Sequence, residues 1–210
     1  MRRDAPVYVL RHGETEWNRE GRIQGARDSA LTERGRAQAA AMGRALAAEL
    51  ALDPASTNFL RSPLGRTRET SLIVGRSLGL DPLCWQDDLR LAEFCYGDWE
   101  GLTWPEIEAV QPHAYAEWRA DPEAFAAPAG ESHLDLHRRS ASALYDIARS
   151  ATRTVIVGHG VSGAVLRSIY LGLDARAGLA LEKPQDAFFR LQGGREVVIG
   201  ADRDLAPRVA

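Results

Sequence analysis

Two short apolar runs stand out in the pattern of hydrophobic and polar positions along the chain. The first covers residues 7–10 and continues into Arg11, His12 and a glycine, and the second covers residues 154–157 and continues into His159 between two glycines. Short apolar runs that end in a turn are typical of buried strands in a parallel sheet. Ligands of such sheets bind at the carboxyl ends of the strands. We therefore expect both histidines to lie at one end of a sheet.

Four helices are expected from apolar periodicity and from residues that typically begin and end helices. Thr32 and Ser62 are the expected N-caps of the first two helices, and Ser132 begins the third. Pro63 suits the first position of the second helix, and Gly79 suits its end. The expected helices cover residues 33–50, 63–78 and 132–150, and a fourth follows Gly160 and ends at Leu171.

The remaining apolar segments are short and predict further strands. They cover residues 55–60 and 82–85, and residues 186–191 and 196–200 form a terminal hairpin around the two glycines between them. Strands that alternate with helices predict an α/β protein, a three-layer α/β/α sandwich with a mostly parallel sheet. No repeat or linker divides the sequence, so we expect residues 1–210 to form a single domain.

One segment departs from this alternation. It combines aromatic residues with prolines between short helical pieces, and Thr103 followed by Glu106 forms a capping box. We expect a small helical lid insertion, about residues 94–130, that lies over the edge of the sheet. Its aromatic side chains are expected both to cover the substrate and to form a core within the insertion, with Trp99 and Trp104 mainly structural.

Composition narrows the classes of function. The chain has 210 residues, 45% of them hydrophobic, and a formal net charge of -3, so we expect neither nucleic acid nor an anionic membrane surface as a partner. Lys183 is the only lysine, so a phosphate site must be built from arginines. Cys84 and Cys95 show no metal or redox spacing, and no segment resembles a signal peptide or a membrane span. A cytoplasmic location is therefore expected.

The two strand-end histidines are the strongest candidates for chemistry. An arginine, an imidazole and free backbone amides at one strand end are typical of an anion site that contains a nucleophile. Arg11 precedes His12, and Arg66 lies one turn into the second expected helix, from which its side chain can return to the same end of the sheet. A single histidine at a strand end is weak evidence, whereas His12 and His159 together, each next to glycine, are much stronger.

Three other patterns suggest different chemistry and are rejected. Residues 158–163 fit G-x-G-x-x-G, but no following strand carries the acidic residue that a dinucleotide site needs. Ser162 fits a serine nucleophile only loosely, because every histidine precedes it and the hydrolase order requires one after it. His133 and His137 are four residues apart, but without an intervening glutamate and a third ligand we expect no metal site.

The run LRHGETEWN at residues 10–18 resembles the signature motif of the histidine phosphatase superfamily, in its phosphoglycerate-mutase-like branch. Further blocks are similar to those of the family and follow in the same order. They cover residues 21–25, 31–35, 62–67, 91–93, 97–102, 130–132 and 157–160. Ala92 and Ala129 depart from the family pattern, which usually has arginine and glycine there. The resemblance covers nearly the whole chain.

The resemblance implies a role for each candidate residue. His12 is the nucleophile and becomes phosphohistidine, and Glu93 protonates the leaving oxygen and later takes a proton from water. The implied catalytic residues are His12, Glu93 and His159. The implied phosphate-binding residues are Arg11, Arg66, His159, Asn18 and Gln24. No metal and no cofactor are expected, because the arginines supply the positive charge.

Elementary chemistry sets two conditions on His12. An imidazole attacks only through a free lone pair, so His12 must be neutral, and neighbouring guanidiniums disfavour its protonated form. The other ring nitrogen must donate a hydrogen bond to an acceptor that fixes the tautomer. We expect this acceptor to be a backbone carbonyl.

The leading prediction is a cofactor-independent phosphatase that hydrolyses small phosphomonoesters. Phosphoglycerate mutase is the alternative, but a mutase needs extra basic residues, and residues 103–128 contain one arginine, Arg119. A non-catalytic member that binds phosphorylated ligands or proteins is a second alternative, although such a protein would typically lose His12 or Glu93. The expected partner is a small phosphorylated metabolite, and the terminal hairpin offers an edge for a homodimer.

Overall fold

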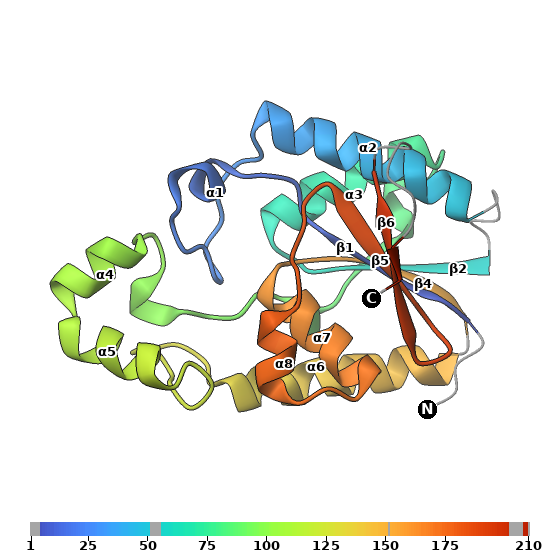
Figure 1. Ribbon diagram of the computed structural model, residues 1–210. Coiled ribbons are helices and arrows are strands. Elements are labelled where there is room, and N and C mark those ends of the chain that lie inside the picture. Colours follow the sequence, from blue (N-terminus) through green and yellow to red (C-terminus); the bar gives the residue numbers. More distant parts are fainter. Residues whose placement is uncertain (1–4, 51–55, 151, 202–207, 210) are drawn as a thin grey trace.

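The computed structural model describes residues 5–50, 56–150, 152–201 and 208–209 (Figure 1). Within them, seven strands form one sheet in the order β3-β2-β4-β1-β5-β6-β7. The strands are β1 Val7–Arg11, β2 Thr57–Arg61, β3 Trp85–Asp87, β4 Arg153–Gly158, β5 Ala187–Gln192, β6 Arg195–Gly200 and β7 Arg208–Val209. Both histidine-bearing strands, β1 and β4, are neighbours at the centre of this sheet.

The sheet is parallel where it carries the candidate site. β3, β2, β4 and β1 pair in parallel, and β5, β6 and β7 add antiparallel strands at the other side, so that β6 points the same way as the parallel set. Arg11 pairs with Gly158 at the carboxyl ends of β1 and β4. His12 and His159 therefore leave the sheet side by side, as the two apolar runs predict.

Helices cover both faces of the sheet and confirm the predicted α/β sandwich (Figure 1). They are α1 Glu16–Glu20, α2 Glu33–Glu49, α3 Gly65–Ser77, α4 Trp104–Val110, α5 Pro112–Ala120, α6 His133–Ser150, α7 Val161–Leu171 and α8 Ala175–Ala180. Helix α8 was not expected from the sequence. None of the helices in the described part of the chain combines the length and apolar character that crossing a bilayer requires.

The alternation of side chains along β1 explains why both faces need a helical layer. Tyr8 and Leu10 belong to one core cluster with side chains of α2 and α3, and Val7 and Val9 belong to another with side chains of α6 and α7. Successive side chains of a strand point to opposite faces. Because all four are buried, the strand is apolar throughout, which is typical of a sheet covered on both sides.

The start of α3 differs from the prediction. The helix begins at Gly65, and Leu64 at the N-cap position makes no side-chain hydrogen bond. The prediction that Ser62 caps this helix from a start at Pro63 is wrong. The carboxylate of Asp28 instead accepts hydrogen bonds from the N–H groups of Gly65 and Arg66. A capping group from a distant loop thus satisfies N–H groups at the start of the helix that lack partners within it.

Two short strands are also displaced from their predicted positions. Residues Pro82–Cys84 form a 3-10 turn, whose start is capped by the Asp81 side chain, and the strand follows at Trp85–Asp87. The prediction of a strand at 82–85 is therefore wrong, because a proline that follows a capping aspartate favours a turn. The strand expected at 55–60 is Thr57–Arg61, and Ala55 lies outside the described residues.

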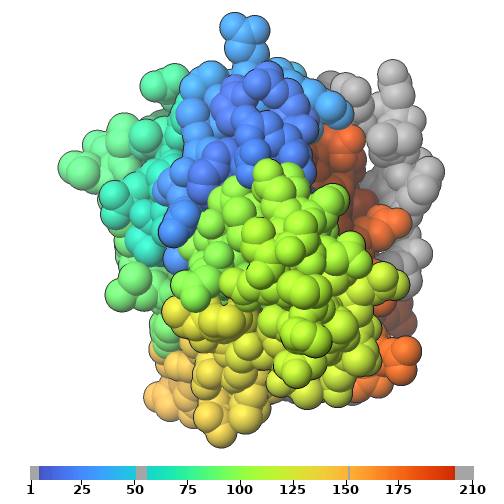
Figure 2. Space-filling model, turned by 90° about the vertical axis from the view of Figure 1, so that its left-hand side faces the viewer, coloured from blue at the N-terminus to red at the C-terminus, as the bar shows by residue number. Residues whose placement is uncertain are grey.

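Residues 94–130 contain α4 and α5 and lie beyond the carboxyl ends of the parallel strands, not along an edge strand (Figure 1). Backbone hydrogen bonds join them to the segment after α1, because Ile23 N–H donates to Leu102 and Gly101 N–H donates to Ile23. Figure 2 shows the insertion, in green to yellow, packed against the blue N-terminal segment. These contacts place the insertion at the end of the sheet.

The insertion has an aromatic core of its own. Trp99 is fully buried, stacks on Phe125 and meets Trp104 and Trp118 edge to face. The predicted capping box is present, with Thr103 and Glu106 exchanging hydrogen bonds at the start of α4. Trp99 and Trp104 are thus structural residues. Closure of the insertion over a substrate stays a prediction.

Candidate active site

His12 and His159 lie together where β1 and β4 end. The His12 N–H donates to the Gly158 carbonyl, and the two imidazole rings are 5.3 Å apart between centroids, at an angle of 64°. Each histidine is only 2% exposed. The sequence pattern therefore correctly predicts that the two imidazoles lie together, and the structure shows that both are buried.

The turn after His12 depends on the absence of a side chain at Gly13. A Cβ atom at this position would lie 2.1 Å from the Gly35 carbonyl oxygen, so only glycine lets the chain pass the start of α2. The Gly13 N–H donates to the Thr70 hydroxyl on α3, 3.2 Å away. The residue after the candidate nucleophile is thus held between α2 and α3.

His12 has the protonation state and tautomer that nucleophilic attack requires. Burial first, and then the positive charges of Arg11 and Arg66, hold the pKa of His12 well below its ordinary value of 6.5. Its Nδ1 lies 2.8 Å from the Gly13 carbonyl oxygen, an acceptor only, so Nδ1 carries the proton and donates it. The lone pair therefore resides on Nε2, and the expected backbone acceptor is the Gly13 carbonyl.

Arg66 is buried among backbone carbonyls and one carboxylate. Its Nη1 donates to the Arg27 carbonyl (2.6 Å) and to Asp28 (2.8 Å), and its Nη2 donates to the Gly25 carbonyl (2.8 Å). The Asp28 carboxylate thus holds the guanidinium and also caps the helix that bears it. Sequence reasoning missed Asp28, because a single aspartate in a polar loop gives no signal of its distant partners.

Arg11 differs from Arg66 in keeping a buried donor without a protein partner. Its Nη1 donates to the Lys183 carbonyl at 2.5 Å, whereas its Nε is buried and has no hydrogen-bond partner within the described part of the chain. Burial lowers the pKa of Arg11, with Glu93 opposing and Arg66 adding to this shift. Buried unpaired donors are rare in folded proteins, and one at a candidate site fits an anionic ligand.

Both ring nitrogens of His159 are engaged by the protein. Nδ1 accepts from Arg66 Nε at 3.2 Å, which leaves the proton on Nε2 to be donated to the Ser62 hydroxyl at 2.7 Å. Burial first, then Arg66, His12 and Arg11, hold the pKa of His159 well below its ordinary value. His159 is therefore neutral and fixes the orientation of Arg66.

Glu93 lies at the start of α7. Its two carboxylate oxygens accept four backbone hydrogen bonds, from the N–H groups of Gly160, Val161, Ser162 and Phe94, at 2.8–3.1 Å. A carboxylate at a helix N-terminus satisfies amides that lack partners within the helix. The same side chain also faces the candidate nucleophile, because Glu93 and His12 line one cavity.

Arg139 of α6 holds the loop that carries Glu93. It donates to the carbonyls of Arg90, Ala92 and Glu93 and forms a two-point ion pair with Glu131. An arginine on a helix face is ordinarily solvated, so sequence reasoning gave no indication of this role. The position of the carboxylate thus depends on α6 as well as on α7.

Asn18 and Gln24 complete the wall of the cavity. The Asn18 oxygen accepts from the Gln185 side chain at 2.9 Å and from the Thr15 N–H at 3.3 Å. Gln24 accepts from the Ser29 hydroxyl through its oxygen at 3.4 Å. Because the oxygens of both side-chain amides already accept hydrogen bonds, their NH₂ groups are available to donate to a ligand. Gln185, which orients Asn18, is a further residue that the sequence did not single out.

A cavity of about 150 Å³ contains six of the seven site residues predicted from the sequence. It is lined by Arg11, His12, Asn18, Arg22, Ile23, Gln24, Gly25, Arg66, Glu93 and Tyr96. His159 is the predicted residue that does not line it. The predicted residues that line the cavity therefore present a neutral imidazole, two guanidiniums, two amides and a carboxyl group to one ligand.

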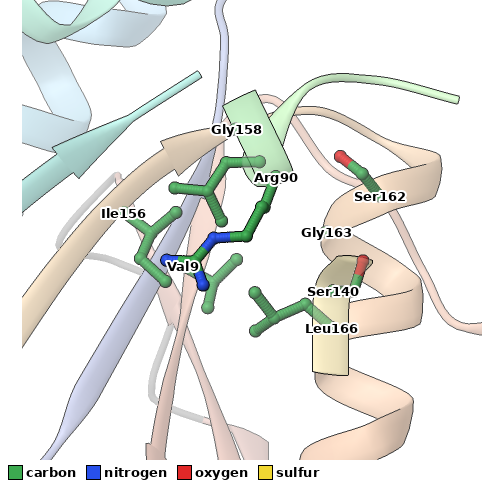
Figure 3. Close-up of a pocket in the computed structure, with 9 residues that line it drawn as sticks. Val9, Arg90, Ser140, Ile156, Gly158, Ser162, Gly163 and Leu166 are labelled. Atoms are coloured by element: carbon green, nitrogen blue, oxygen red, sulfur yellow. The ribbon is translucent and has the colours of Figure 1, made fainter. Parts of the chain in front are cut away.

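Two other cavities lie elsewhere. The one in Figure 3 lies between β1, β4 and α7 near Arg90, has a volume of about 10 Å³ and is lined mainly by apolar atoms, so it holds at most one water molecule. A larger groove of about 710 Å³ separates the end of α5 from α8, and Arg119 and Arg176 lie on its two sides. Neither contains a predicted catalytic residue.

His133, the first of the two histidines on α6, has a structural role. His133 stacks on Phe94 with ring centroids 4.5 Å apart, and burial lowers its pKa. Among the described residues, no three His, Cys, Asp or Glu side chains come together in a way that could hold a metal ion.

Comparison with known proteins identifies the family to which this chain belongs. The family model described as the histidine phosphatase superfamily (branch 1) matches residues 7–195. The chain belongs to this superfamily. It is 36% identical over 173 residues to a probable phosphoglycerate mutase GpmB of Escherichia fergusonii, covering 81% of this chain and 77% of that protein. It is 35% identical over 176 residues to a glucosyl-3-phosphoglycerate phosphatase of Mycolicibacterium vanbaalenii, covering 80% and 74%.

Solved structures agree with this histidine phosphatase fold. A mycobacterial glucosyl-3-phosphoglycerate phosphatase in complex with inorganic phosphate superimposes with a TM-score of 0.72 and 30% identity, covering 89% of this chain and 88% of that one. The phosphoglycerate-mutase-like resemblance inferred from the sequence is confirmed. Relatives of this chain include both phosphatases and GpmB-like mutases, so the family alone does not select between these reactions.

Proposed function

We propose that this protein is a metal-independent phosphatase that hydrolyses small phosphomonoesters through a phosphohistidine on His12. One observation carries the proposal. His12 is neutral, its Nδ1 proton is held by the Gly13 carbonyl, and its Nε2 lone pair belongs to a side chain that lines a cavity with Arg11 and Arg66. A nucleophile beside two guanidiniums is suited to attack on a phosphoryl group.

The reaction proceeds in two displacements. The reaction starts with the carboxyl group of Glu93 protonated. Nε2 of His12 attacks phosphorus, the bond from phosphorus to the ester oxygen breaks, and Glu93 delivers its proton to that oxygen, so that a neutral alcohol leaves and Glu93 becomes a carboxylate. Glu93 then takes a proton from water, whose oxygen attacks phosphorus and breaks the bond to His12. Inorganic phosphate leaves, and the residues return to their starting states. Each step uses only groups that line the cavity.

The arginines stabilise the charge that develops on the phosphoryl oxygens. Arg11 offers its unpaired Nε. Arg66 has five N–H groups, of which four are given to His159, Arg27, Asp28 and Gly25, so one remains for the substrate. The amides of Asn18 and Gln24 add neutral donors. His159 contributes by fixing Arg66, and direct contact of His159 with the phosphoryl group stays a prediction.

Phosphatase activity is favoured over mutase activity by the position of basic residues. A mutase must bind the second anionic group of its bisphosphate intermediate. Arg119, which is the single arginine of residues 103–128, lines the groove against α8 and not the catalytic cavity. The insertion thus supplies no cation to the catalytic cavity for a second anionic group.

The deciding experiment compares 4-nitrophenyl phosphate and 3-phosphoglycerate as substrates of the same preparation. We expect release of inorganic phosphate from the aryl ester, and an acid-labile, base-stable phosphoryl label on the protein after rapid quenching. Efficient conversion of 3-phosphoglycerate to its isomer with negligible hydrolysis would establish the mutase instead. Binding of phosphate without turnover of either compound would support the non-catalytic alternative.

A further inference from the structure

The cavity has an outer part that the phosphoryl chemistry does not use. Of the described residues that line it, three are cationic, and two of these, Arg11 and Arg66, act on the phosphoryl group in the proposed reaction. Arg22 is the third. Any second anionic group on a substrate would therefore depend on Arg22 for a counter-charge within this cavity.

Arg22 is already held by two carboxylates. Its Nε donates to Glu20 at 2.9 Å, and its Nη1 donates to Glu106 at 2.8 Å and to the Gly101 carbonyl at 2.8 Å. The three side chains together carry one net negative charge. The outer part of the cavity is thus weakly repulsive to anions, although an arginine forms part of its wall.

The position of Glu106 is set before any ligand binds. Its carboxylate also accepts from the Thr103 N–H at 2.8 Å, as part of the capping box that begins α4. Arg22 in turn lies in a backbone bridge with Thr103, where the insertion meets the N-terminal segment (Figure 2). Glu106 is therefore held beside Arg22 by the fold of the insertion.

The rest of the outer wall is uncharged. Ile23 offers an apolar surface, and Tyr96 offers a hydroxyl. Burial raises the pKa of Tyr96, with the negative charge of Glu93 adding to the effect, so its hydroxyl stays protonated. Such groups bind an alcohol through hydrogen bonds and apolar contact.

We infer that this site selects phosphomonoesters of uncharged alcohols over those that carry a carboxylate or a second phosphate, and that Glu20 and Glu106 set this selectivity by holding Arg22. The inference rests on the proposed phosphatase activity and names the class of its substrate. It assigns the two glutamates as specificity-determining residues, which act through Arg22.

The test uses two esters that share a three-carbon skeleton. Glycerol 3-phosphate carries a hydroxymethyl group where 3-phosphoglycerate carries a carboxylate. Each is measured as a substrate and as a competitor of 4-nitrophenyl phosphate, so that an ester that turns over slowly still gives a binding constant. We expect the wild-type protein to favour glycerol 3-phosphate by about 3- to 10-fold, because the ion pairs are partly exposed and screened.

Removing the two glutamate charges should shift the preference toward 3-phosphoglycerate. In a Glu20→Gln/Glu106→Gln variant, Arg22 becomes an uncompensated cation, and the ratio of constants should move toward 3-phosphoglycerate by about 10-fold at low salt. Glutamine at position 106 retains an oxygen for the Thr103 N–H. Glu16→Gln/Glu69→Gln is the matched control, because it also removes two negative charges, and both residues are partly exposed, pair with an arginine and do not line the cavity.

The outcomes separate this inference from the function on which it rests. Absence of 4-nitrophenyl phosphate hydrolysis would overturn the proposed function. The selectivity alone would be overturned by two results. One is hydrolysis of this ester with equal preference for glycerol 3-phosphate and 3-phosphoglycerate. The other is an unchanged ratio of the constants for these two esters in the folded Glu20→Gln/Glu106→Gln variant. A shift in the Glu16→Gln/Glu69→Gln control as large as that in the Glu20→Gln/Glu106→Gln variant would also overturn it, because the selectivity would then depend on the net charge of the protein and not on Arg22.

Discussion

The ends of β1 and β4 have the same sequence pattern, but the histidines that follow them have different surroundings. Each strand is apolar and buried, each ends in histidine beside glycine, and burial lowers the pKa of both His12 and His159. The difference lies in their hydrogen bonds. His12 gives one nitrogen to the Gly13 carbonyl and keeps the other for the cavity, whereas His159 gives its nitrogens to Arg66 and Ser62.

This difference shows that the strand end provides a position and that the neighbouring segments determine the role. The partner of His12 is local, because the Gly13 carbonyl belongs to the next residue. The partners of His159 come from the segment that begins α3, far away in the sequence. In the proposed mechanism, the first histidine reacts and the second holds the group that binds the phosphoryl oxygens.

The largest effect is expected from removing the nucleophile. His12→Ala should lower kcat/KM for 4-nitrophenyl phosphate by on the order of 10⁴–10⁶-fold and abolish the phosphoryl label on the protein. His137→Ala is the matched control, because His137 is an exposed histidine of α6 and should leave both unchanged. Phosphatase activity that persists in the folded His12→Ala protein would contradict the mechanism and remove the distinction between the two strand ends.

Glu93 connects the two strand ends, since it lines the cavity with His12 and caps the helix that follows His159. Glu93→Gln should lower kcat/KM by on the order of 10²–10⁴-fold for an alkyl phosphate, because the alkoxide then leaves without a proton. The loss should be smaller for 4-nitrophenyl phosphate, whose leaving group needs little protonation. The measurement is the ratio of the two losses.

A role of Glu93 in capping alone predicts a different result. Glu93→Gln would then lower the activity toward both esters equally and lower the unfolding midpoint, because the glutamine amide leaves some of the α7 N–H groups without an acceptor. Ser132→Ala serves as a comparison for stability, since its hydroxyl accepts from the Asp135 N–H at the start of α6 and does not line the cavity.

The sequence predicts the elements whose causes are local. The buried strand β1, the helix capped by Thr32 and the capping box at Thr103 depend on residues within a few positions, and each is present. Parallel pairing then makes the meeting of His12 and His159 predictable, because neighbouring parallel strands end at one edge. The resemblance to a family supplied Glu93, which no local pattern singles out.

The residues that orient the site could not be predicted, because their partners lie far away in the sequence. Asp28 holds Arg66 from 38 residues away, and Gln185 holds Asn18 from 167 residues away. Neither aspartate in a polar loop nor glutamine before a strand has a pattern that specifies its partner. The error at Ser62 has the same origin, because the hydroxyl expected to cap α3 accepts a hydrogen bond from His159 while Asp28 caps the helix.

A smaller effect should follow from breaking the contacts of His159. His159→Gln should lower kcat/KM by about 10²-fold, because Arg66 loses the acceptor of its Nε and shifts from its productive position. Ser62→Ala should have a smaller effect of the same kind. In a double-mutant cycle the two losses should be non-additive, since both act on Arg66 through one chain of hydrogen bonds.

The phosphate ion as a competitive inhibitor distinguishes indirect from direct action. If His159 acts through Arg66, Ser62→Ala should weaken phosphate binding in the same sense as His159→Gln, and the cycle should show coupling. Full additivity, with phosphate binding weakened only in His159→Gln, would establish that His159 itself contacts the phosphoryl oxygens. Both strand ends would then bind the substrate, and the roles of His12 and His159 would differ less.

The smallest effect concerns stability in mild acid. His12 and His159 have native pKa values well below 6.5, so between those values and 6.5 the unfolded chain binds protons that the native protein does not. Stability therefore falls as pH falls below 6.5, by up to about 1.4 kcal/mol per pH unit for each histidine. His133, with a lowered pKa, acts in the same direction.

Urea unfolding between pH 7.5 and 5 measures this dependence of stability on pH above the range in which carboxylates titrate. His159→Gln should reduce the slope by the contribution of one histidine. An unchanged slope in that variant would show that His159 does not resist protonation, and that burial affects the two strand ends differently.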